Sequence, residues 1–268
     1  IAKTQLMTRF DSIGGGELAV QIFEPAVHKA DAILVHGFTG SKEDFSLIGP
    51  LLAEQGYRVV TSDNRGQHES AHSSDVENYK IPALAQDQIE LAKHFGLDRP
   101  HLFGHSFGGL VAQRAAVEFP AFWSSLTIFC SGPHGMPQWT LLADDIHYLE
   151  EHTMADLWVK NGESQKPGNE VGSLKQRRWA SSDKRSLMTH AEHLMHEPSL
   201  VSRVAATRLP INVIRGENDD AWPHVLQSQM AADLGVEIQI IEDAGHCPNE
   251  DRPQATAKVI ARFWNQFD

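Results

Sequence analysis

Short apolar runs alternate along the chain with longer segments in which apolar residues recur every three or four positions. Runs such as 32–35 and 126–129 are continuously apolar, which is typical of strands buried on both faces. Segments such as 81–95 have the spacing of an amphipathic helix. Regular alternation of the two predicts a mostly parallel sheet flanked by helices. The predicted strands are 32–35, 57–60, 101–103, 126–129, 211–214 and 236–241, and the predicted helices are 45–55, 81–95, 110–119, 225–234 and 259–267.

The first part of the chain has a different pattern. Two β-like runs, 6–10 and 18–24, flank Gly14-Gly15-Gly16 and predict an antiparallel hairpin at one edge of the sheet. We therefore expect an α/β fold with a mostly parallel, doubly wound, eight-stranded sheet flanked by helices.

The alternation stops between residues 132 and 202. This stretch is predicted to form helices and loops, and it holds four of the six Met and three of the six Trp. Such adaptable apolar side chains can shape an apolar pocket, or simply fill the core of a helical subdomain. We predict a helical cap at 132–202, inserted into a core domain formed by 1–131 and 203–268. The tryptophans expected to contact substrate are Trp139, Trp158 and Trp179.

Composition narrows the possible partners. The chain has 268 residues and a net charge of −12, so it lacks the basic surface that nucleic acids require. No apolar run approaches the roughly 18 residues of a membrane span, and the first residues lack the apolar core of a signal peptide. We expect a cytoplasmic protein with a small-molecule substrate and with neither nucleic acid nor membrane as a partner. The sequence indicates no oligomeric state.

Neither a metal nor a cofactor is predicted. Cys130 and Cys247 match no ligand or redox spacing and are expected to be buried thiols. His190, His193 and His196 repeat at three-residue intervals, but no carboxylate or cysteine joins them at ligand spacing.

The strongest candidate for chemistry is Gly104-His105-Ser106-Phe107-Gly108, a G-x-S-x-G pattern between a predicted strand and a predicted helix. In such a turn the serine takes a strained backbone conformation, and the glycines let the strand and the helix approach. The serine hydroxyl is thereby presented to a substrate. Because serines between glycines also occur in ordinary turns, the flanking strand and helix are essential to this interpretation.

Another glycine follows the strand 32–35, in His36-Gly37-Phe38, and frees a backbone N–H at the crevice where α/β proteins bind ligands. Acyl transfer requires two such donors around a developing oxyanion, and we assign them to Phe38 and Phe107. The alternative is a plain strand-to-helix loop. The further residues expected at the substrate site are His36, Gly37 and His105, the histidines as hydrogen-bonding neighbours.

Serine is a poor nucleophile at neutral pH and needs a histidine that is itself oriented by a buried carboxylate. His246 follows the last predicted strand, and Asp219 and Asp220 follow the strand 211–214. Asp243 is a further candidate acid. The order Ser106, Asp219, His246 is one of the known chain orders of such triads.

Five motifs, in this order and over nearly the full chain, resemble the landmarks of the α/β-hydrolase superfamily. The resemblance implies Ser106 as nucleophile, His246 as general base and acid, and Asp219, three residues after Gly216, as the orienting acid in preference to Asp220 or Asp243. It also implies a cap where 132–202 lies. The motifs are His36-Gly37, Asp63-x-Arg65-Gly66, Gly104-x-Ser106-x-Gly108-Gly109, Gly216-x-Asn218-Asp219-x-x-x-Pro223 and Gly245-His246.

The resemblance also narrows the reaction. Haloalkane dehalogenases and epoxide hydrolases have aspartate where this chain has Ser106. Carbon–carbon bond hydrolases commonly have asparagine before the serine and tryptophan after the histidine, where this chain has His105 and Cys247. We therefore expect a serine hydrolase of a small carboxylic ester or lactone, with an acyl-enzyme on Ser106. The alternatives are a cofactor-independent dioxygenase, a perhydrolase or haloperoxidase-like enzyme, a carbon–carbon bond hydrolase and a hydrolase-like small-ligand receptor.

Basic residues gather in the second half of the predicted cap. They form either a solvated face or a binding site for a substrate carboxylate. These residues are Lys175, Arg177, Arg178, Lys184 and Arg185.

Overall fold

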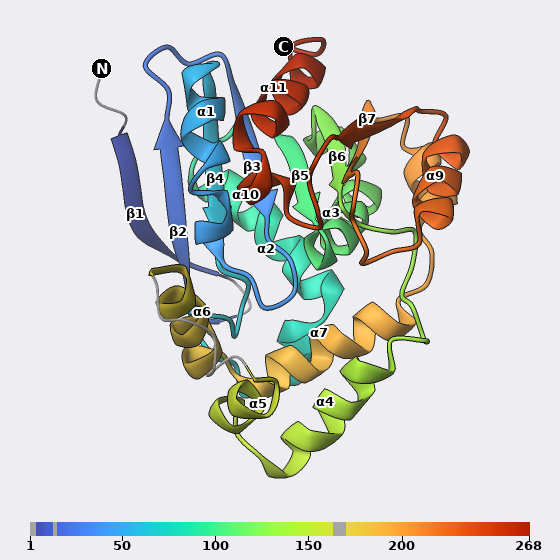
Figure 1. Ribbon diagram of the computed structural model, residues 1–268. Helices are drawn as coiled ribbons and strands as arrows, with labels where there is room; N and C mark the ends of the chain where they lie inside the picture. Colours follow the sequence, from blue (N-terminus) through green and yellow to red (C-terminus); the bar gives the residue numbers. More distant parts are fainter. Residues whose placement is uncertain (1–3, 13–14, 163–169) are drawn as a thin grey trace.

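The computed structural model describes residues 4–12, 15–162 and 170–268; Gly14 of the predicted hairpin and 163–169 of the predicted cap lie outside the described residues. One eight-stranded sheet runs through the molecule in the order β1-β2-β4-β3-β5-β6-β7-β8 (Figure 1). The pairings β1–β2 and β2–β4 are antiparallel and the others are parallel, which confirms the predicted fold class. The strands are β1 Thr4–Asp11, β2 Glu17–Glu24, β3 Ala30–Val35, β4 Tyr57–Ser62, β5 His101–His105, β6 Ser125–Phe129, β7 Ile211–Gly216 and β8 Ile238–Ile241.

Successive side chains of the inner strands point to opposite faces of the sheet. In β3, Ile33 and Val35 join the core cluster on one face, and Ala32 and Leu34 join the cluster on the other. Both faces are covered by helices, which is why the side chains of the inner strands are almost all buried, including polar ones such as His101, Thr127 and Asn212. One face carries α2 (Ile81–His94), α3 (Phe107–Glu118), α8 (Val201–Ala206) and α9 (His224–Asp233), and the other carries α1 (Ile48–Glu54) and α11 (Pro253–Trp264).

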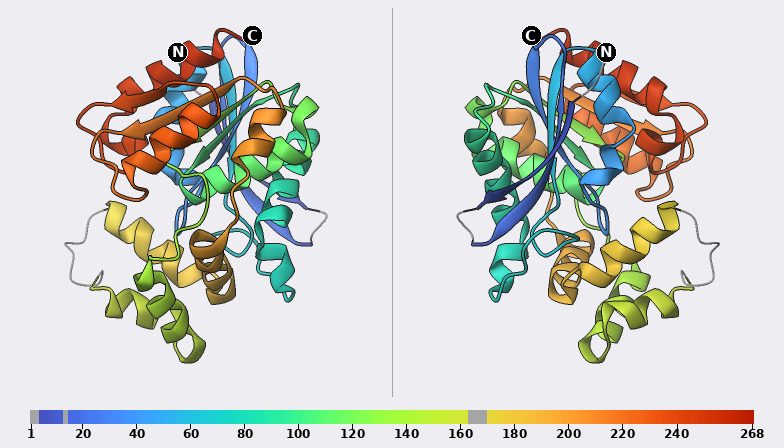
Figure 2. Two further views of the ribbon diagram at one scale, coloured as in Figure 1. Left: turned by 90° about the vertical axis from the view of Figure 1, so that its right-hand side faces the viewer. Right: turned by 90° about the vertical axis from the view of Figure 1, so that its left-hand side faces the viewer.

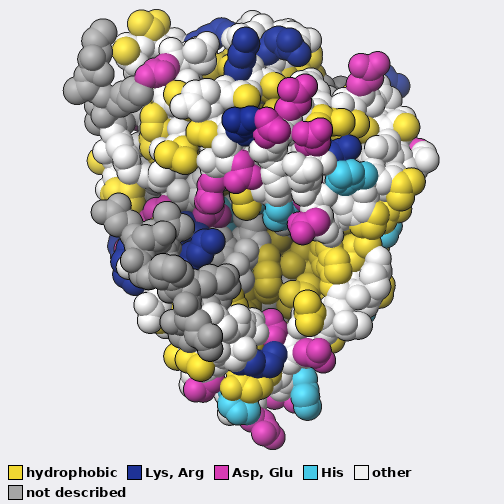
Figure 3. Space-filling view, viewed as in Figure 1, with side chains coloured by type: hydrophobic (Ala, Val, Ile, Leu, Met, Phe, Trp, Pro, Cys, Tyr) yellow, Lys and Arg dark blue, Asp and Glu magenta, His cyan; other side chains and the backbone are white. Residues whose placement is uncertain are grey.

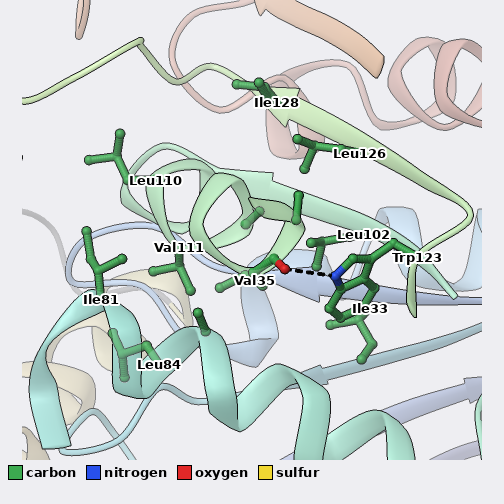
Figure 4. Close-up of a cluster of buried hydrophobic side chains, with 14 of the residues drawn as sticks. Ile33, Val35, Ile81, Leu84, Leu102, Leu110, Val111, Trp123, Leu126 and Ile128 are labelled. Atoms are coloured by element: carbon green, nitrogen blue, oxygen red, sulfur yellow. Dashed lines mark hydrogen bonds between the residues drawn. The ribbon is translucent and has the colours of Figure 1, made fainter. Parts of the chain in front are cut away.

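The larger core cluster holds α3, the helix that follows Ser106, firmly against the sheet. Leu110 and Val111 of α3 lie in this cluster with Leu102 of β5 (Figure 4). Trp123 is fully buried beside them, and its indole N–H donates to the carbonyl of Ala115 at 3.2 Å. Burial of each such side chain contributes about 1.5–3 kcal/mol. The turn between β5 and α3 therefore sits on a rigid base.

The helices α4 to α7 lie between β6 and β7 in the sequence and gather on one side of the molecule, apart from the helices that flank the sheet (Figures 1 and 2). The N–H of Asp183 donates to the Gly66 carbonyl at 2.8 Å, and its carboxylate accepts the Tyr79 hydroxyl at 2.7 Å, so this group is tied to the sheet domain. The group also has a small apolar cluster of its own, Leu149, Met154, Leu157 and Leu187. The helices are α4 Thr140–Glu151, α5 Met154–Lys160, α6 Glu170–Ser181 and α7 Lys184–His196.

Several element bounds differ from the sequence prediction; the closing helix predicted at 259–267, for example, is α11, Pro253–Trp264. The predicted helix 45–55 is divided into η1 (Lys42–Phe45) and α1, and Pro50, which has no N–H, lies in the first turn of α1 where no helical donor is needed. β8 begins at Ile238 because the N–H of Val236 donates to Ala231, at the end of α9, at 3.0 Å. No helix among the described residues is both long and apolar enough to span a bilayer. The remaining short helices are η2 Val76–Tyr79, η3 Pro120–Phe122 and α10 Pro248–Asp251.

Candidate active site

Ser106 occupies a sharp turn between β5 and α3. Its φ of 55° and ψ of −120° place a non-glycine residue in a strained region of backbone space. The turn is possible because glycines lie where the backbone crowds: a Cβ on Gly104 would lie 2.2 Å from the Gly108 carbonyl oxygen, and a Cβ on Gly108 would lie 2.3 Å from the carbonyl oxygen of Val35. The turn holds the serine side chain at the carboxyl end of β5, facing the crevice.

A chain of hydrogen bonds joins three side chains from three separate loops. The Nε2 atom of His246 lies 2.9 Å from Ser106 Oγ, and its Nδ1 lies 2.8 Å from Asp219 Oδ1. The Asp219 side chain is fully buried, whereas 28% of the His246 side chain is exposed. The imidazole therefore lies between a buried acid and a hydroxyl at the crevice, with its accessible edge available to solvent or substrate.

The surroundings of Asp219 keep it ionised. Burial alone would raise the pKa of Asp219, but hydrogen bonds from His246, Gln227 and the Ala221 N–H together hold it below its usual value. Gln227 donates to the second carboxylate oxygen at 3.0 Å. No motif marks Gln227, which lies inside α9, so sequence reasoning missed it; only its position one helical turn past Pro223 could have indicated it.

The other two candidate acids lie elsewhere. Asp220 is exposed, and Asp243 is exposed and ion-paired with Arg252. Of the three acids weighed from the sequence, the structure brings Asp219 to His246.

His105 and His36 are buried beside this chain but differ in position. His105 Nε2 bonds the His246 carbonyl at 2.9 Å, and burial, with the nearby imidazole of His246, lowers the pKa of His105 to about 3. His36 accepts the Asn64 N–H at 2.9 Å, and burial lowers its pKa to about 4. His105 lines the cavity described below, but His36 does not. The expected substrate contact of His36 is thus corrected: its ring fixes the loop after β4.

The loop after β3 packs directly against the serine. A Cβ on Gly37 would lie 3.1 Å from the Ser106 Cβ, tighter than an ordinary contact, so glycine favours this close approach of the loop. The N–H of Phe38 donates to no backbone acceptor of the described residues. Phe107 is the first residue of α3, so its N–H has no hydrogen-bond acceptor within the helix. Both N–H groups are therefore available beside Ser106.

A cavity of about 310 Å³ opens over Ser106 and His246, between the strand ends and α5 and α6. Figure 3 shows a hollow between the sheet domain and the inserted helices, with hydrophobic side chains along its wall. Trp158 and Trp179 line the cavity and pack edge to face, with ring centroids 5.7 Å apart. Its other lining residues are Gly37, Phe38, Thr39, Gly40, Asp44, His105, Lys175, Arg178, Cys247, Asn249 and Glu250.

Trp139 does not line this cavity, which corrects the prediction that it contacts substrate there. It packs edge to face on Trp222 at a centroid distance of 4.9 Å and belongs to the periphery of the larger core cluster. The residue lies just before α4, and its ring covers part of the larger core cluster. A count of tryptophans in the insertion could not separate these two roles.

One cluster of metal-ligating atoms lies at the site. The atoms of His105, Cys130 and His246 lie within 4.8 Å of one another. However, both ring nitrogens of His246 are engaged by Asp219 and Ser106, and burial raises the pKa of the Cys130 thiol well above its usual value. Metal ligands must be deprotonated and free to bind, so these residues do not fit a metal while the hydrogen-bond chain is intact.

Comparisons with known proteins agree with this architecture. A putative 2-succinyl-6-hydroxy-2,4-cyclohexadiene-1-carboxylate synthase of Bacillus subtilis is 23% identical over 252 residues, covering 86% of this chain and 89% of that protein. The enol-lactonase of Burkholderia xenovorans LB400 superimposes with a TM-score of 0.78 at 20% identity, covering 96% and 100% of the two chains. An esterase of Exiguobacterium antarcticum gives 0.81 at 16% identity, covering 97% and 100%. At these identities the two solved structures establish the fold alone.

The sequence profile described as "Alpha/beta hydrolase family" matches residues 32–259, which include the serine turn, Asp219 and His246. The chain belongs to the alpha/beta hydrolase family.

Proposed function

We propose that the protein hydrolyses a small carboxylic ester or lactone through an acyl-enzyme on Ser106. The observation that carries this proposal is the unbroken hydrogen-bond chain from Asp219 through His246 to Ser106, which ends in a cavity. The N–H groups of Phe38 and Phe107 beside it have no backbone acceptor in the part of the chain that the structure describes. Such an arrangement supplies a nucleophile, a proton acceptor and an oxyanion site within one crevice. The likeness to an esterase and an enol-lactonase is consistent with this reaction class.

In the first half of the reaction, Ser106 Oγ attacks the substrate carbonyl carbon while its proton moves to His246 Nε2. The carbonyl oxygen becomes an oxyanion, which the N–H groups of Phe38 and Phe107 bind. Asp219 stabilises the imidazolium and holds His246 in the tautomer whose Nε2 can accept the proton. When the tetrahedral intermediate collapses, the C–O bond of the ester breaks, and His246 returns the proton to the leaving alcohol or to the opened lactone oxygen.

In the second half, water attacks the acyl carbon of the Ser106 ester. His246 Nε2 takes a proton from this water, and the same two N–H groups hold the second oxyanion. The acyl C–Oγ bond then breaks, His246 returns the proton to Ser106 Oγ, and the carboxylic acid product loses its proton to solvent as it leaves. His105 acts as a positioning residue, because its bond to the His246 carbonyl fixes the loop that carries the imidazole. Every protein group named in these steps belongs to this chain.

The test is turnover of short p-nitrophenyl esters by the wild-type protein and by Ser106→Ala. We expect the substitution to reduce kcat by about 10⁴ or more while leaving the melting temperature near that of the wild type. Undiminished ester turnover in Ser106→Ala would remove the proposed function. Oxygen uptake is measured separately with a heteroaromatic substrate, because oxygen consumption that survives Ser106→Ala would instead favour a cofactor-independent dioxygenase.

A further inference from the structure

The helix α6 turns a cationic face into the cavity that contains Ser106. Lys175, Arg178 and Trp179 stand three and four residues apart, so they share one side of the helix, and all three line the cavity. Arg177 is adjacent in sequence but exposed, and it does not line the cavity. Arg178, in contrast, is only 7% exposed. A buried guanidinium at a substrate cavity needs acceptors for its N–H groups.

The protein supplies only part of what this guanidinium requires. Arg178 Nη2 lies 2.7 Å from Asp44 Oδ1. Its Nε is buried and has no hydrogen-bond partner among the described residues. Asp44 also accepts the Ser41 N–H on its other oxygen at 3.3 Å, so both of its oxygens are already engaged. Arginine presents five N–H donors in a planar fork, which leaves Arg178 able to bind a second acceptor from the cavity.

We propose that the substrate hydrolysed at Ser106 carries a carboxylate, which Arg178 and Lys175 bind while the ester or lactone carbonyl lies at Ser106. This inference rests on the proposed function and deepens it by naming the substrate class: monoesters of dicarboxylic acids, or lactones that bear a carboxylate. The carboxylate satisfies the buried guanidinium, and the aromatic rings of Trp158 and Trp179 pack against the carbons that separate the two ends of the substrate.

The charges around the cavity limit how much negative charge the substrate can bring. Lys175 and Arg178 are matched in number by the lining acids Asp44 and Glu250. The chain as a whole carries a net charge of −12, so nothing beyond the cavity attracts a polyanion. A carboxylate brings one charge and two oxygens in the geometry of the guanidinium fork, whereas a phosphate monoester brings nearly two charges. The acids therefore select against phosphate.

The test compares substrates that differ only in this charge. Monomethyl esters of succinic, glutaric and adipic acid are each paired with the methyl ester in which the free carboxylate is a carboxamide, and released methanol is measured. We expect kcat/KM to be at least about tenfold higher for the carboxylate member at one or more chain lengths. Equal kcat/KM values for the two members at every length would overturn the inference.

Substitutions on α6 test whether its basic side chains cause the preference for the carboxylate substrate. Arg178→Gln and Lys175→Gln should each reduce severalfold the ratio of kcat/KM for the carboxylate member to kcat/KM for the carboxamide member, and Arg177→Gln should leave this ratio unchanged. Lys175 is exposed, so Lys175→Gln remains informative if Arg178→Gln does not fold. A preference that persists undiminished in Lys175→Gln and in every folded Arg178 variant would contradict the inference.

A binding measurement separates this inference from the proposed function. In Ser106→Ala, glutarate or adipate should raise the melting temperature, the corresponding diamide should not, and Arg178→Gln or Lys175→Gln should weaken the rise. If no ester is turned over but the dicarboxylate still binds through these two residues, the proposed function fails and the anion site stands. If neutral esters are turned over and no dicarboxylate binds, the anion site fails and the hydrolase stands.

Discussion

His246 and Ser106, 140 residues apart in the sequence, lie with Nε2 and Oγ 2.9 Å from each other. The contact depends on two features that arise separately: the strained turn that presents the serine and the loop after β8 that presents the imidazole. His105 connects them, because it is the neighbour of Ser106 in β5 and bonds the His246 carbonyl. The contact leads to predictions about Asp219, which bonds the imidazole, about the packing of the turn that carries Ser106, and about the pH dependence of stability.

Asp219→Asn is expected to lower kcat for ester substrates by about 10⁴, because an amide in this place favours the wrong imidazole tautomer and leaves the imidazolium without a countercharge. Asp220→Asn is the matched control, since Asp220 is exposed and follows Asp219 directly. Steady-state kinetics with a p-nitrophenyl ester measures both variants. Equal losses in the two would show that Asp219 is not the orienting acid.

Gln227→Leu should lower kcat about tenfold and raise the pKa of Asp219, because it removes the 3.0 Å hydrogen bond to the second carboxylate oxygen. The KM should change little, since Gln227 does not line the cavity. Gln229→Leu is the control: this glutamine lies on the same helix and bonds the exposed Asp233. The pH dependence of kcat distinguishes the two, and an unchanged profile in Gln227→Leu would contradict a positioning role.

Gly108→Ala should destabilise the protein by about 3 kcal/mol or more, since the new methyl group would lie 2.3 Å from the Val35 carbonyl oxygen and 2.5 Å from that of His36. Relief of this clash would also displace the first turn of α3 and the N–H of Phe107. Gly245→Ala serves for comparison, because its methyl group would meet nothing closer than 3.5 Å. Denaturant unfolding measures both, and equal midpoints would argue against the close packing described for the turn.

The free energy of unfolding should fall as the pH is lowered from about 6.5 towards 4, with a slope of up to about 1.4 kcal/mol per pH unit for each buried histidine. Burial lowers the pKa of His190 to about 3, as it does for His105, and that of His36 to about 4, so these rings bind protons in the unfolded chain before the folded one. The contribution of these histidines to the free energy of unfolding is fully present above their pKa in the unfolded chain. It is lost as the pH falls towards their pKa in the folded protein.

His190→Leu tests this directly, because the ring stacks on Phe107 at 4.5 Å, where an apolar side chain can replace it. We expect a shallower slope of unfolding free energy against pH between 6.5 and 4. His147→Gln, at a side chain that is 87% exposed, should leave the slope unchanged. If His190→Leu keeps the wild-type slope, the buried imidazole is not a source of acid sensitivity.

The sequence alone predicted the sheet and the meeting of Ser106, Asp219 and His246 beyond the ends of its strands. Continuous apolar runs mark strands covered on both faces, and the glycines around Ser106 mark a turn that few other residues permit. The roles of side chains in the inserted helices were less predictable, because composition does not tell an aromatic residue that lines a cavity from one that packs in a core. Trp179 lines the cavity, whereas Trp139 packs on Trp222. Arg178 illustrates the same limit: α6 buries it, while its neighbour Arg177 stays exposed, and only the helix orientation separates them.

The central claim is that Ser106 is a nucleophile activated by His246, and the most direct measurement is peptide-level mass spectrometry after reaction with a fluorophosphonate probe. The account predicts a single adduct on the peptide that contains Ser106, no adduct in Ser106→Ala, and labelling slowed by about 10³ or more in His246→Gln. Labelling of another residue in the wild-type protein, or undiminished labelling of Ser106 when His246 is replaced, would contradict it.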